Sequence, residues 1–557
     1  MPNILGIHFT HDSSVCLLEN GRLKKYFLVE RFTRLKHDCF AGYNKQLKEI
    51  EKIFENINEK IDYICVSNFN VRDEGAENAF INIDRVCKIF KKENPDLKII
   101  KRENHHANHA YPAFYNSNFE ESLVVVIDGN GSLVFQQEDM HFVEVESVFK
   151  FNRNEHSLIY KNVVDYKRSD SLLWDSKIRK VEFDKYDHKN IFGIGMLYDT
   201  AAILMGNTSD DCGKAMGLSS YGKNNELFSN LFISGNNFNN DFFYLSSKKI
   251  KSFLKNPIPV KITAKNYKLH ADYCYEVQQQ TQKAAGDIIE NSIKKTGIKK
   301  VCITGGYGLN VVANHYFIKR FPDVEFYFEP ICSDNGMSIG AAMGFYKEEF
   351  GKNPLPIKNT FFHGVKHDIS SFKGKTTSVE KISQLILDNK SVAVFRGLAE
   401  AGQRALGNRS IFFNALNKDA KKIVNKIKRR EWYRPFACAV LEEDVEKFFY
   451  MSGVKSSPFM TTCFPVKEEF WNIIPGVTHV DKTCRIQTVN KNDGYLYDLL
   501  ISLKKKSGYG IVLNTSFNLA GDPLVETPEE AFDVLRKSYL DFLWFEETKQ
   551  IFKKVKK

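Results

Sequence analysis

The chain of 557 residues is long enough for two to four domains, each with its own core. Its 43% hydrophobic and 26% charged residues are ordinary values for a globular protein. The formal net charge of +11 would help to capture phosphorylated substrates. This charge is also compatible with nucleic acid, but no basic arm or tail beyond the short lysine-rich end indicates such a partner.

Eleven cysteines are scattered without a C-x-x-C pair, which favours a reducing compartment and predicts a cytoplasmic protein. The first residues lack a basic region followed by an apolar run, so no signal peptide is predicted. No apolar segment approaches ~18 residues, so we predict no transmembrane helix and no membrane partner.

Two short apolar runs near the start, residues 4–6 and 15–18, predict strands, and Glu19-Asn20-Gly21 after the second is a strong hairpin signal. His11-Asp12-Ser13-Ser14 lies between these strands, where actin-like and kinase-like ATPase folds hold phosphate. The basic segment from Glu30 to His37, which includes Lys36, is either an exposed loop or a contact to an anionic ligand.

Further along, the hydrophobic pattern predicts an amphipathic helix over residues 46–58 and a buried strand over residues 63–67. A long helix over residues 271–295 should end at Gly297. The polar residues 162–187 predict an irregular surface segment.

His105 and His109 are four residues apart, so they fall on one face of a helix and can share one metal ion. Such pairs are also common by chance. The apolar run 123–127 predicts a buried strand that delivers Asp128 at its carboxyl end, before a tight glycine turn. Asp334 repeats this logic, at a predicted strand end before a helix. Imidazoles with carboxylates suit iron or manganese better than structural zinc.

A glycine-rich turn follows the strand predicted at residues 301–304. It contains Gly305, Gly306 and Asn310, and a helix should begin near residue 311. Backbone N–H groups in such a turn can approach a phosphate or a nucleoside closely. The alternative interpretation is an ordinary tight turn.

Basic residues gather after a proline-containing connector at residues 351–358, where we place a domain boundary. Guanidinium groups bind phosphate bidentately and lysine adds a compact charge, so such a cluster is suited to a small oxyanion. The alternative is a solvated basic face. Apolar residues alternate with the basic ones, so part of the cluster should be buried. Its members are Arg404, Arg409, Lys428, Arg430 and Arg434.

Together these motifs resemble the O-carbamoyltransferases typified by the tobramycin, cephamycin and nodulation-factor enzymes. The resemblance covers nearly the whole chain, from His11 to Asn518. The matching stretches are HDSS, ERFTRLKHD, HHANHA, VIDGNGS, GKAMGLSSYG, GGYGLNVVAN, SDNGMSIGAA, RALGNRS, KRREWYRPFA, PGVTHVDKTCRIQTV and LNTSFN.

The resemblance implies a mixed α/β protein with two domains. Residues 1–352 would form an actin-like ATPase fold similar to the universal tRNA-modification protein. Residues 359–557 would form a YrdC-like domain, similar to threonylcarbamoyl-adenylate synthase. The first domain would bind Fe²⁺, or another divalent transition metal, through the motif-matched residues His105, His109, Asp128 and Asp334.

The implied chemistry has two steps. The second domain would make carbamoyl-adenylate from carbamoyl phosphate and ATP, with Mg²⁺, and the first would transfer the carbamoyl group to an acceptor hydroxyl. We expect His11 or His37 to act as the base, and a homodimer would fit the family. The motif-matched catalytic residues are Arg404, Lys428, Arg434 and Arg485. The expected cofactor-binding residues are Lys36, Gly305, Gly306, Asn310, Arg409 and Asn514.

The chain departs from the family at three points, which bear on nucleotide affinity and on acceptor choice. Ala401-Gly402-Gln403 replaces F-G-P, Leu519-Ala520 replaces a frequent arginine, and Cys212 replaces a frequent acid. Two rival functions are a fused tRNA threonylcarbamoylation enzyme and an actin-like ATPase acting as a chaperone or scaffold. The acceptor, whether antibiotic, glycan, hydroxylated nucleoside or DNA base, is not encoded in a readable motif.

Overall fold

The computed structural model describes residues 2–38, 47–67, 86–92, 94–137, 140–165, 193–205, 207–208, 211–228, 232–233, 237–238, 262–357 and 361–554. These residues form two compact units. The first contains residues 2–24 and 58–357, and the second contains residues 25–38, 47–57 and 361–554. The second unit is therefore built from separate stretches of the chain, including a part of the sequence that we had assigned to the first domain.

One sheet of the first unit has the strand order β3-β2-β1-β4-β5. The first strand, β1, is antiparallel to β2 and parallel to β4. The predicted hairpin connects β2 to β3, with Asn20 at φ 48° and Gly21 at φ 78°. The strands are β1 (Asn3–His8), β2 (Ser14–Glu19), β3 (Arg22–Leu28), β4 (Tyr63–Ser67) and β5 (Lys98–Arg102).

The other sheet of this unit repeats the same arrangement. Its first strand, β6, is central, antiparallel to β8 and parallel to β12, which pairs in parallel with β13. Both β7 and β9 pair with β8. The strands are β6 (Glu121–Ile127), β7 (Leu133–Gln137), β8 (Met140–Asn152), β9 (His156–Asp165), β12 (Lys300–Thr304) and β13 (Glu325–Phe328).

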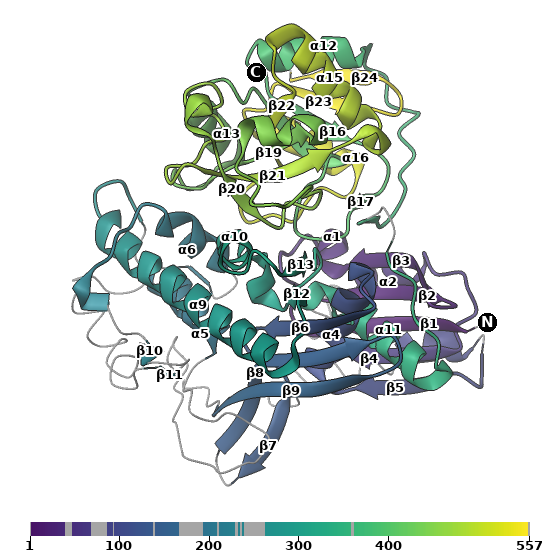
Figure 1. The fold of residues 1–557 in the computed structure, drawn as a ribbon. Helices are drawn as coiled ribbons and strands as arrows, with labels where there is room; N and C mark the ends of the chain where they lie inside the picture. Colours follow the sequence, from purple (N-terminus) through teal and green to yellow (C-terminus); the bar gives the residue numbers. More distant parts are fainter. Residues whose placement is uncertain are drawn as a thin grey trace. The chain divides into compact units, whose positions relative to one another are not determined.

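Two helices pack against each other between these sheets (Figure 1). Helix α11 (Met337–Phe350) covers β1, β2 and β4, whereas α4 (His105–Ser117) covers β6, β8 and β12. The helices approach so closely at Gly340 that a Cβ atom there would lie 1.7 Å from the Asn108 carbonyl oxygen. The remaining long helices of this unit are α5 (Ile194–Leu204), α6 (Cys212–Ser219), α9 (Tyr267–Thr296) and α10 (Val311–Arg320).

The second unit has a nine-stranded sheet of order β15-β24-β23-β16-β18-β22-β19-β21-β20. The strands are β15 (Lys375–Thr376), β16 (Val392–Phe395), β18 (Arg409–Phe413), β19 (Ala437–Leu441), β20 (Cys463–Pro465), β21 (Thr483–Val489), β22 (Ile511–Ser516), β23 (Phe542–Phe545) and β24 (Gln550–Lys553). The strands β14 (Phe362–His363) and β17 (Ala399–Glu400) form a separate antiparallel pair in this unit.

Alternate residues of β16 enter two different cores, as the period of a strand requires. Val392 and Val394 pack with α12 (Val379–Leu387) and α15 (Tyr495–Ser507). The intervening Ala393 and Phe395 pack with residues of α13 (Ala420–Lys428) and α16 (Pro528–Lys537). The sheet is therefore covered by helices on both faces.

Several predicted boundaries agree with the structure. The long helix α9 ends at Gly297 in a left-handed conformation, as predicted. The predicted helix 46–58 is α2 (Leu47–Phe54), with residue 46 outside the described residues. Of the predicted irregular segment 162–187, residues 162–165 belong to β9 instead, and the rest lies outside the described residues. No described helix has the length and apolar character needed to span a bilayer.

The contact between α4 and α11 should be sensitive to a single methyl group. Gly340→Ala would place this group against the backbone of α4, and we expect a loss of about 1–3 kcal/mol in the free energy of unfolding. Gly213→Ala is the matched control, because that glycine lies in an exposed turn of α6 with open space around it. Thermal and denaturant unfolding would measure both, and equal stability of the two variants would contradict the tight packing.

Candidate active sites: a histidine–aspartate cluster and a cation cluster

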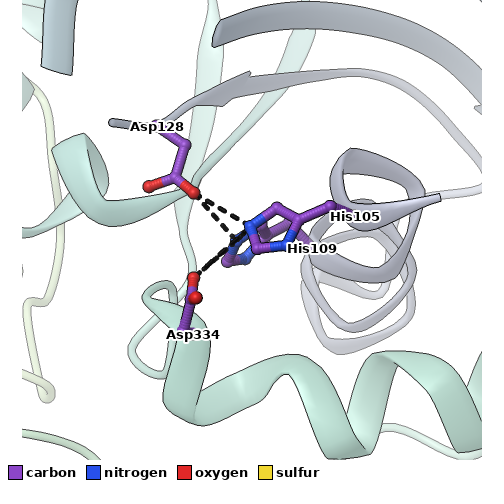
Figure 2. A group of neighbouring side chains, drawn as sticks. All are labelled: His105, His109, Asp128 and Asp334. Atoms are coloured by element: carbon purple, nitrogen blue, oxygen red, sulfur yellow. Dashed lines mark hydrogen bonds and ion pairs between the residues drawn. The ribbon is translucent and has the colours of Figure 1, made fainter. Parts of the chain in front are cut away.

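Four buried side chains of the first unit converge in the histidine–aspartate cluster, formed by His105, His109, Asp128 and Asp334 (Figure 2). The Nε2 atoms of the two histidines are 3.0 Å apart. Asp128 Oδ2 lies 3.0 Å from His105 Nε2 and 3.5 Å from His109 Nε2. Asp334 Oδ1 lies 3.4 and 3.3 Å from the same two nitrogens. The prediction that these residues meet is therefore correct in space.

Three different segments deliver the cluster. The histidines lie on successive turns of α4, whose N-cap Asn104 accepts a hydrogen bond from the Ala107 N–H. Asp128 follows β6 directly, as predicted. Asp334 does not: β13 ends at Phe328, and Asp334 begins a 3₁₀ turn, η5 (Asp334–Gly336), immediately before α11.

A glycine turn fixes the direction of the Asp128 carboxylate. The Gly306 N–H donates to Asp128 Oδ1 at 2.9 Å, which leaves Oδ2 facing the histidines. The preceding Gly305 has φ +83°, and a Cβ atom there would lie 2.3 Å from the Ile127 carbonyl oxygen. Only glycine fits this position without strain.

The donor set fits a divalent transition metal. A metal about 2.1 Å from each ligand gives neighbouring ligand atoms a spacing of about 3.0–3.4 Å, which matches the observed separations. Two imidazole nitrogens that face each other are satisfied by one shared cation. Two imidazoles with two carboxylates are a hard-to-intermediate set, suited to iron or manganese.

The electrostatics of the cluster also favour a cation. Burial opposes protonation of His105, but the carboxylates of Asp334 and Asp128 outweigh it and raise the pKa of His105 to about 10. Burial alone would raise the pKa of Asp128, yet hydrogen bonds from the two histidines hold this pKa well below its usual value. The carboxylates therefore stabilise positive charge at the centre of the cluster, whether a proton or a metal carries it.

Buried Glu144, which the sequence did not single out, binds the backbone next to the cluster. Glu144 Oε1 accepts hydrogen bonds from the backbone N–H groups of His106 at 3.1 Å and Ser132 at 3.2 Å. Its other oxygen is ion-paired with Lys161. Glu144 thus joins the start of α4 to the loop after Asp128. The signal in the sequence was a glutamate between two valines of an apolar strand, where a charge needs a partner.

Two further histidines lie beside Asp334. Buried His8 has its Nε2 3.4 Å from Asp334 Oδ2, and its Nδ1 is 2.8 Å from Ser67 Oγ. Burial lowers the pKa of His8. His11 Nδ1 lies 3.5 Å from the same Asp334 oxygen, and its side chain is 57% exposed. The other candidate base, His37, belongs to the second unit.

The predicted nucleotide-binding turn has much of its polar surface engaged inside the protein. The Gly306 N–H binds Asp128, as described above. Asn310 caps α10 by accepting from the Ala313 N–H at 3.0 Å, and its amide nitrogen donates to Tyr198 Oη at 3.1 Å. A nucleotide contact by Gly305, Gly306 and Asn310 stays a prediction.

Six basic residues of the second unit form the cation cluster. Arg404 precedes β18, Lys428 ends α13, and Arg485 lies on β21. Burial, and then the charges of nearby Arg404 and Arg430, hold the pKa of Arg485 well below its usual value. The members of the cluster are Lys36, Arg404, Lys428, Arg430, Arg434 and Arg485.

Positive charge dominates the surroundings of Lys428 and Arg485 in this cluster. Burial, and then the charges of Arg430 and Arg434, hold the pKa of Lys428 well below its usual value, and Lys36 adds to the effect. Among the described residues, no carboxylate is a main influence on the pKa of Lys428 or Arg485. Arg434 does have a carboxylate nearby, since its Nη1 lies 3.7 Å from Glu431 Oε2. A bound anion would relieve the mutual repulsion of the others.

The two lysines of the cluster differ in how they are held. Lys428 Nζ donates to Asn518 Oδ1 at 2.7 Å and to Ser516 Oγ at 3.0 Å. Lys36 follows two arginines that are bound within the second unit: Arg34 donates to the Leu524 carbonyl oxygen at 2.8 Å, and Arg31 to that of Glu400 at 3.3 Å. These two arginines of the basic segment 30–37 therefore bind protein groups, whereas the Lys36 side chain is exposed.

Two predicted ligand-binding residues point into the protein instead. Arg409 is fully buried and donates to the carbonyl oxygens of Arg396 at 2.6 Å and Gly397 at 3.1 Å, while its guanidinium lies 3.6 Å from the centre of the Phe395 ring. Asn514 is also fully buried, and its amide nitrogen donates to Gln487 Oε1 at 2.9 Å. Because both side chains are fully buried and bind protein groups, we do not include them among the ligand contacts proposed below.

Comparisons with known proteins match two parts of the chain to two family models. The Carbamoyltransferase N-terminus family matches residues 74–343, and the Carbamoyltransferase C-terminus family matches residues 383–551. An uncharacterised protein of Methanocaldococcus jannaschii is 30% identical over 98% of this chain and 99% of its own length. The nodulation protein NolNO of Sinorhizobium fredii is 26% identical over 96% of this chain and 78% of its own length.

Among solved structures, HypF of T. kodakarensis covers 63% of this chain and 49% of its own, with 13% identity and a TM-score of 0.41, which is too low to establish a shared fold. The family matches and the full-length relative together show that the chain belongs to the carbamoyltransferase family and is a carbamoyltransferase.

Proposed function

We propose that the chain is an ATP-dependent O-carbamoyltransferase that works in two steps. In the second unit, carbamoyl phosphate would lose phosphate to water, and the resulting carbamate oxygen would attack the α-phosphorus of ATP. Pyrophosphate leaves and carbamoyl-adenylate forms. In the first unit, an acceptor hydroxyl would attack the carbamoyl carbon, giving the carbamate ester and AMP.

The observation that carries the proposal is the cation cluster. Both substrates of the first step are polyanions, and negative charge moves to pyrophosphate as that step proceeds. Arg404, Arg434 and Arg485 would bind and orient the phosphates, while Lys428 neutralises the developing charge; such preorganised charges are usually the largest catalytic contribution. Mg²⁺ would accompany the phosphates of ATP.

The topology of the first unit supports the second step. Two sheets that share one strand order, with helices packed between them, are typical of the actin-like ATPase fold. We therefore propose this fold for the first unit and the YrdC-like fold for the second.

The histidine–aspartate cluster would hold Fe²⁺ in the first unit. When bound, the metal supplies Lewis-acid chemistry, which makes the carbamoyl carbon more electrophilic. His105 and His109 act as neutral ligands, and the Gly306 N–H keeps Asp128 oriented toward them. We assign the base for the acceptor hydroxyl to His11, because it is exposed beside Asp334 and can exchange a proton with solvent.

The first step can be tested by measuring pyrophosphate release from ATP with and without carbamoyl phosphate, and without an acceptor. We expect release to depend on carbamoyl phosphate and to fall about 10²–10³-fold in Arg404→Ala, because a charge that stabilises the leaving pyrophosphate is lost. Arg429→Ala is the matched control, since this exposed neighbour of the cluster donates to the Lys537 carbonyl oxygen instead. Release of ADP and phosphate, independent of carbamoyl phosphate, would overturn the proposal in favour of an ATPase.

A variant of the histidine–aspartate cluster should lose the second step and keep the first. Asp334→Ala should lose bound metal and carbamoyl transfer to a hydroxylated acceptor, while pyrophosphate release stays near the wild-type rate. Metal content measured by elemental analysis and transfer of labelled carbamoyl groups would check this. Asp287→Ala, which removes an ion pair with Arg320 elsewhere in the same unit, controls for stability. Retained transfer in Asp334→Ala would refute the metal assignment.

A further inference from the structure

A single buried carboxylate organises the segment that carries Arg404. Glu400, at the end of β17, is 2% exposed. Its Oε1 atom accepts three backbone hydrogen bonds, from the N–H groups of Leu406 at 2.8 Å, Asn408 at 2.9 Å and Arg409 at 3.1 Å. We call residues 404–409 the arginine loop. Its N–H groups surround Glu400 as they would surround a bound anion.

The carbonyl groups of the same loop are also occupied. The Gln487 amide donates to the Leu406 carbonyl oxygen at 2.8 Å, and that of Asn514 donates to the Ala405 carbonyl oxygen at 3.3 Å. Tyr495 donates to the Gly407 carbonyl oxygen. These contacts explain why Asn514 is turned inward. Both the N–H groups and the carbonyl groups of the loop are therefore hydrogen-bonded. Glu400 is the charged acceptor for the N–H groups.

The hydrogen bonds that the structure describes for the Glu400 side chain all go to the arginine loop. Its Oε2 atom has no hydrogen-bond partner among the residues that the structure describes, and it lines a cavity of about 10 Å³ together with Arg31 and Glu526. The side chain of Asn408 is fixed separately, because it donates to the Leu398 carbonyl oxygen at 2.8 Å. Arg404 immediately precedes the anchored turn, and its charge reaches Arg430 and Arg485 across the cation cluster.

We propose that Glu400 is the positioning residue of the anion site: its carboxylate acts as an internal anion that folds the arginine loop, so that Arg404 is held ready for phosphate before substrate binds. This inference rests on the proposed function of the cation cluster. It predicts that Glu400 acts through the loop and through Arg404, without touching substrate.

The test combines backbone protection with binding of inorganic pyrophosphate. In Glu400→Ala, we expect hydrogen exchange of the amides at 406–409 to accelerate, and pyrophosphate affinity in calorimetry to fall roughly tenfold or more, because a charged acceptor of three hydrogen bonds is lost. Glu400→Gln keeps an acceptor oxygen and should recover much of both. Glu546→Ala is the control, since it breaks a partly exposed ion pair with the Arg396 side chain in the same unit but removes no side-chain acceptor of the loop N–H groups.

A double-mutant cycle distinguishes positioning from a general loss of stability. If Glu400 acts through Arg404, then Glu400→Ala should weaken pyrophosphate binding far less in an Arg404→Ala background than alone. Additive effects, or unchanged exchange at 406–409, would overturn the Glu400 proposal. If Glu400→Ala does not fold, Glu400→Asp keeps the charge but shortens its reach, and should give the same pattern at smaller size.

The same experiment separates this inference from the function on which it rests. If Arg404→Ala itself binds pyrophosphate as tightly as the unaltered protein, the anion site is wrong. If Arg404→Ala weakens binding and neither Glu400 variant does, the anion site stands and the positioning role falls.

Discussion

The close approach of α4 and α11 is the constraint on which the first unit depends. The two helices cover different sheets, and Gly340 lets their backbones meet beside the histidine–aspartate cluster. His105 and His109 come from one helix, and Asp334 lies just before the other. A bulkier contact would move the helices apart and separate ligands whose spacing must hold within a few tenths of an ångström.

The two units solve opposite electrostatic problems by one principle. The first gathers carboxylates and imidazoles that stabilise a cation at their centre. The second gathers guanidinium and ammonium groups, and there burial together with neighbouring positive charge holds the pKa of Lys428 and of Arg485 well below the usual value. In both, charged side chains lie close together in surroundings that are partly or wholly buried, where charge is costly unless it is compensated. In each unit a buried carboxylate, Glu144 or Glu400, accepts backbone hydrogen bonds from a segment next to the cluster.

The sequence predicted that the residues of the histidine–aspartate cluster meet, because a strand end or a helix period determines where Asp128 and His105 lie. It predicted Asp334 for a partly wrong reason, since a 3₁₀ turn and not a strand end presents this residue. Arg409 and Asn514 were predicted as ligand contacts because their types suit phosphate; the direction of a buried side chain depends on tertiary partners that the sequence does not display. The repeated sheet order was also invisible, because strand pairing can repeat without any repeat of residues.

The placement of residues 25–38 has a consequence for synthesis and folding. Arg34 hydrogen-bonds to Leu524, 490 positions later in the chain, and Arg31 approaches Glu526. These contacts can therefore form only after residues 524–526 have been synthesised. Until then the arginines of residues 25–38 lack these partners. A fragment beginning at residue 359 would carry Glu526 without Arg31, which approaches it, and would lack Lys36. The second unit of this enzyme thus needs both an early and a late segment of the chain before it can fold completely.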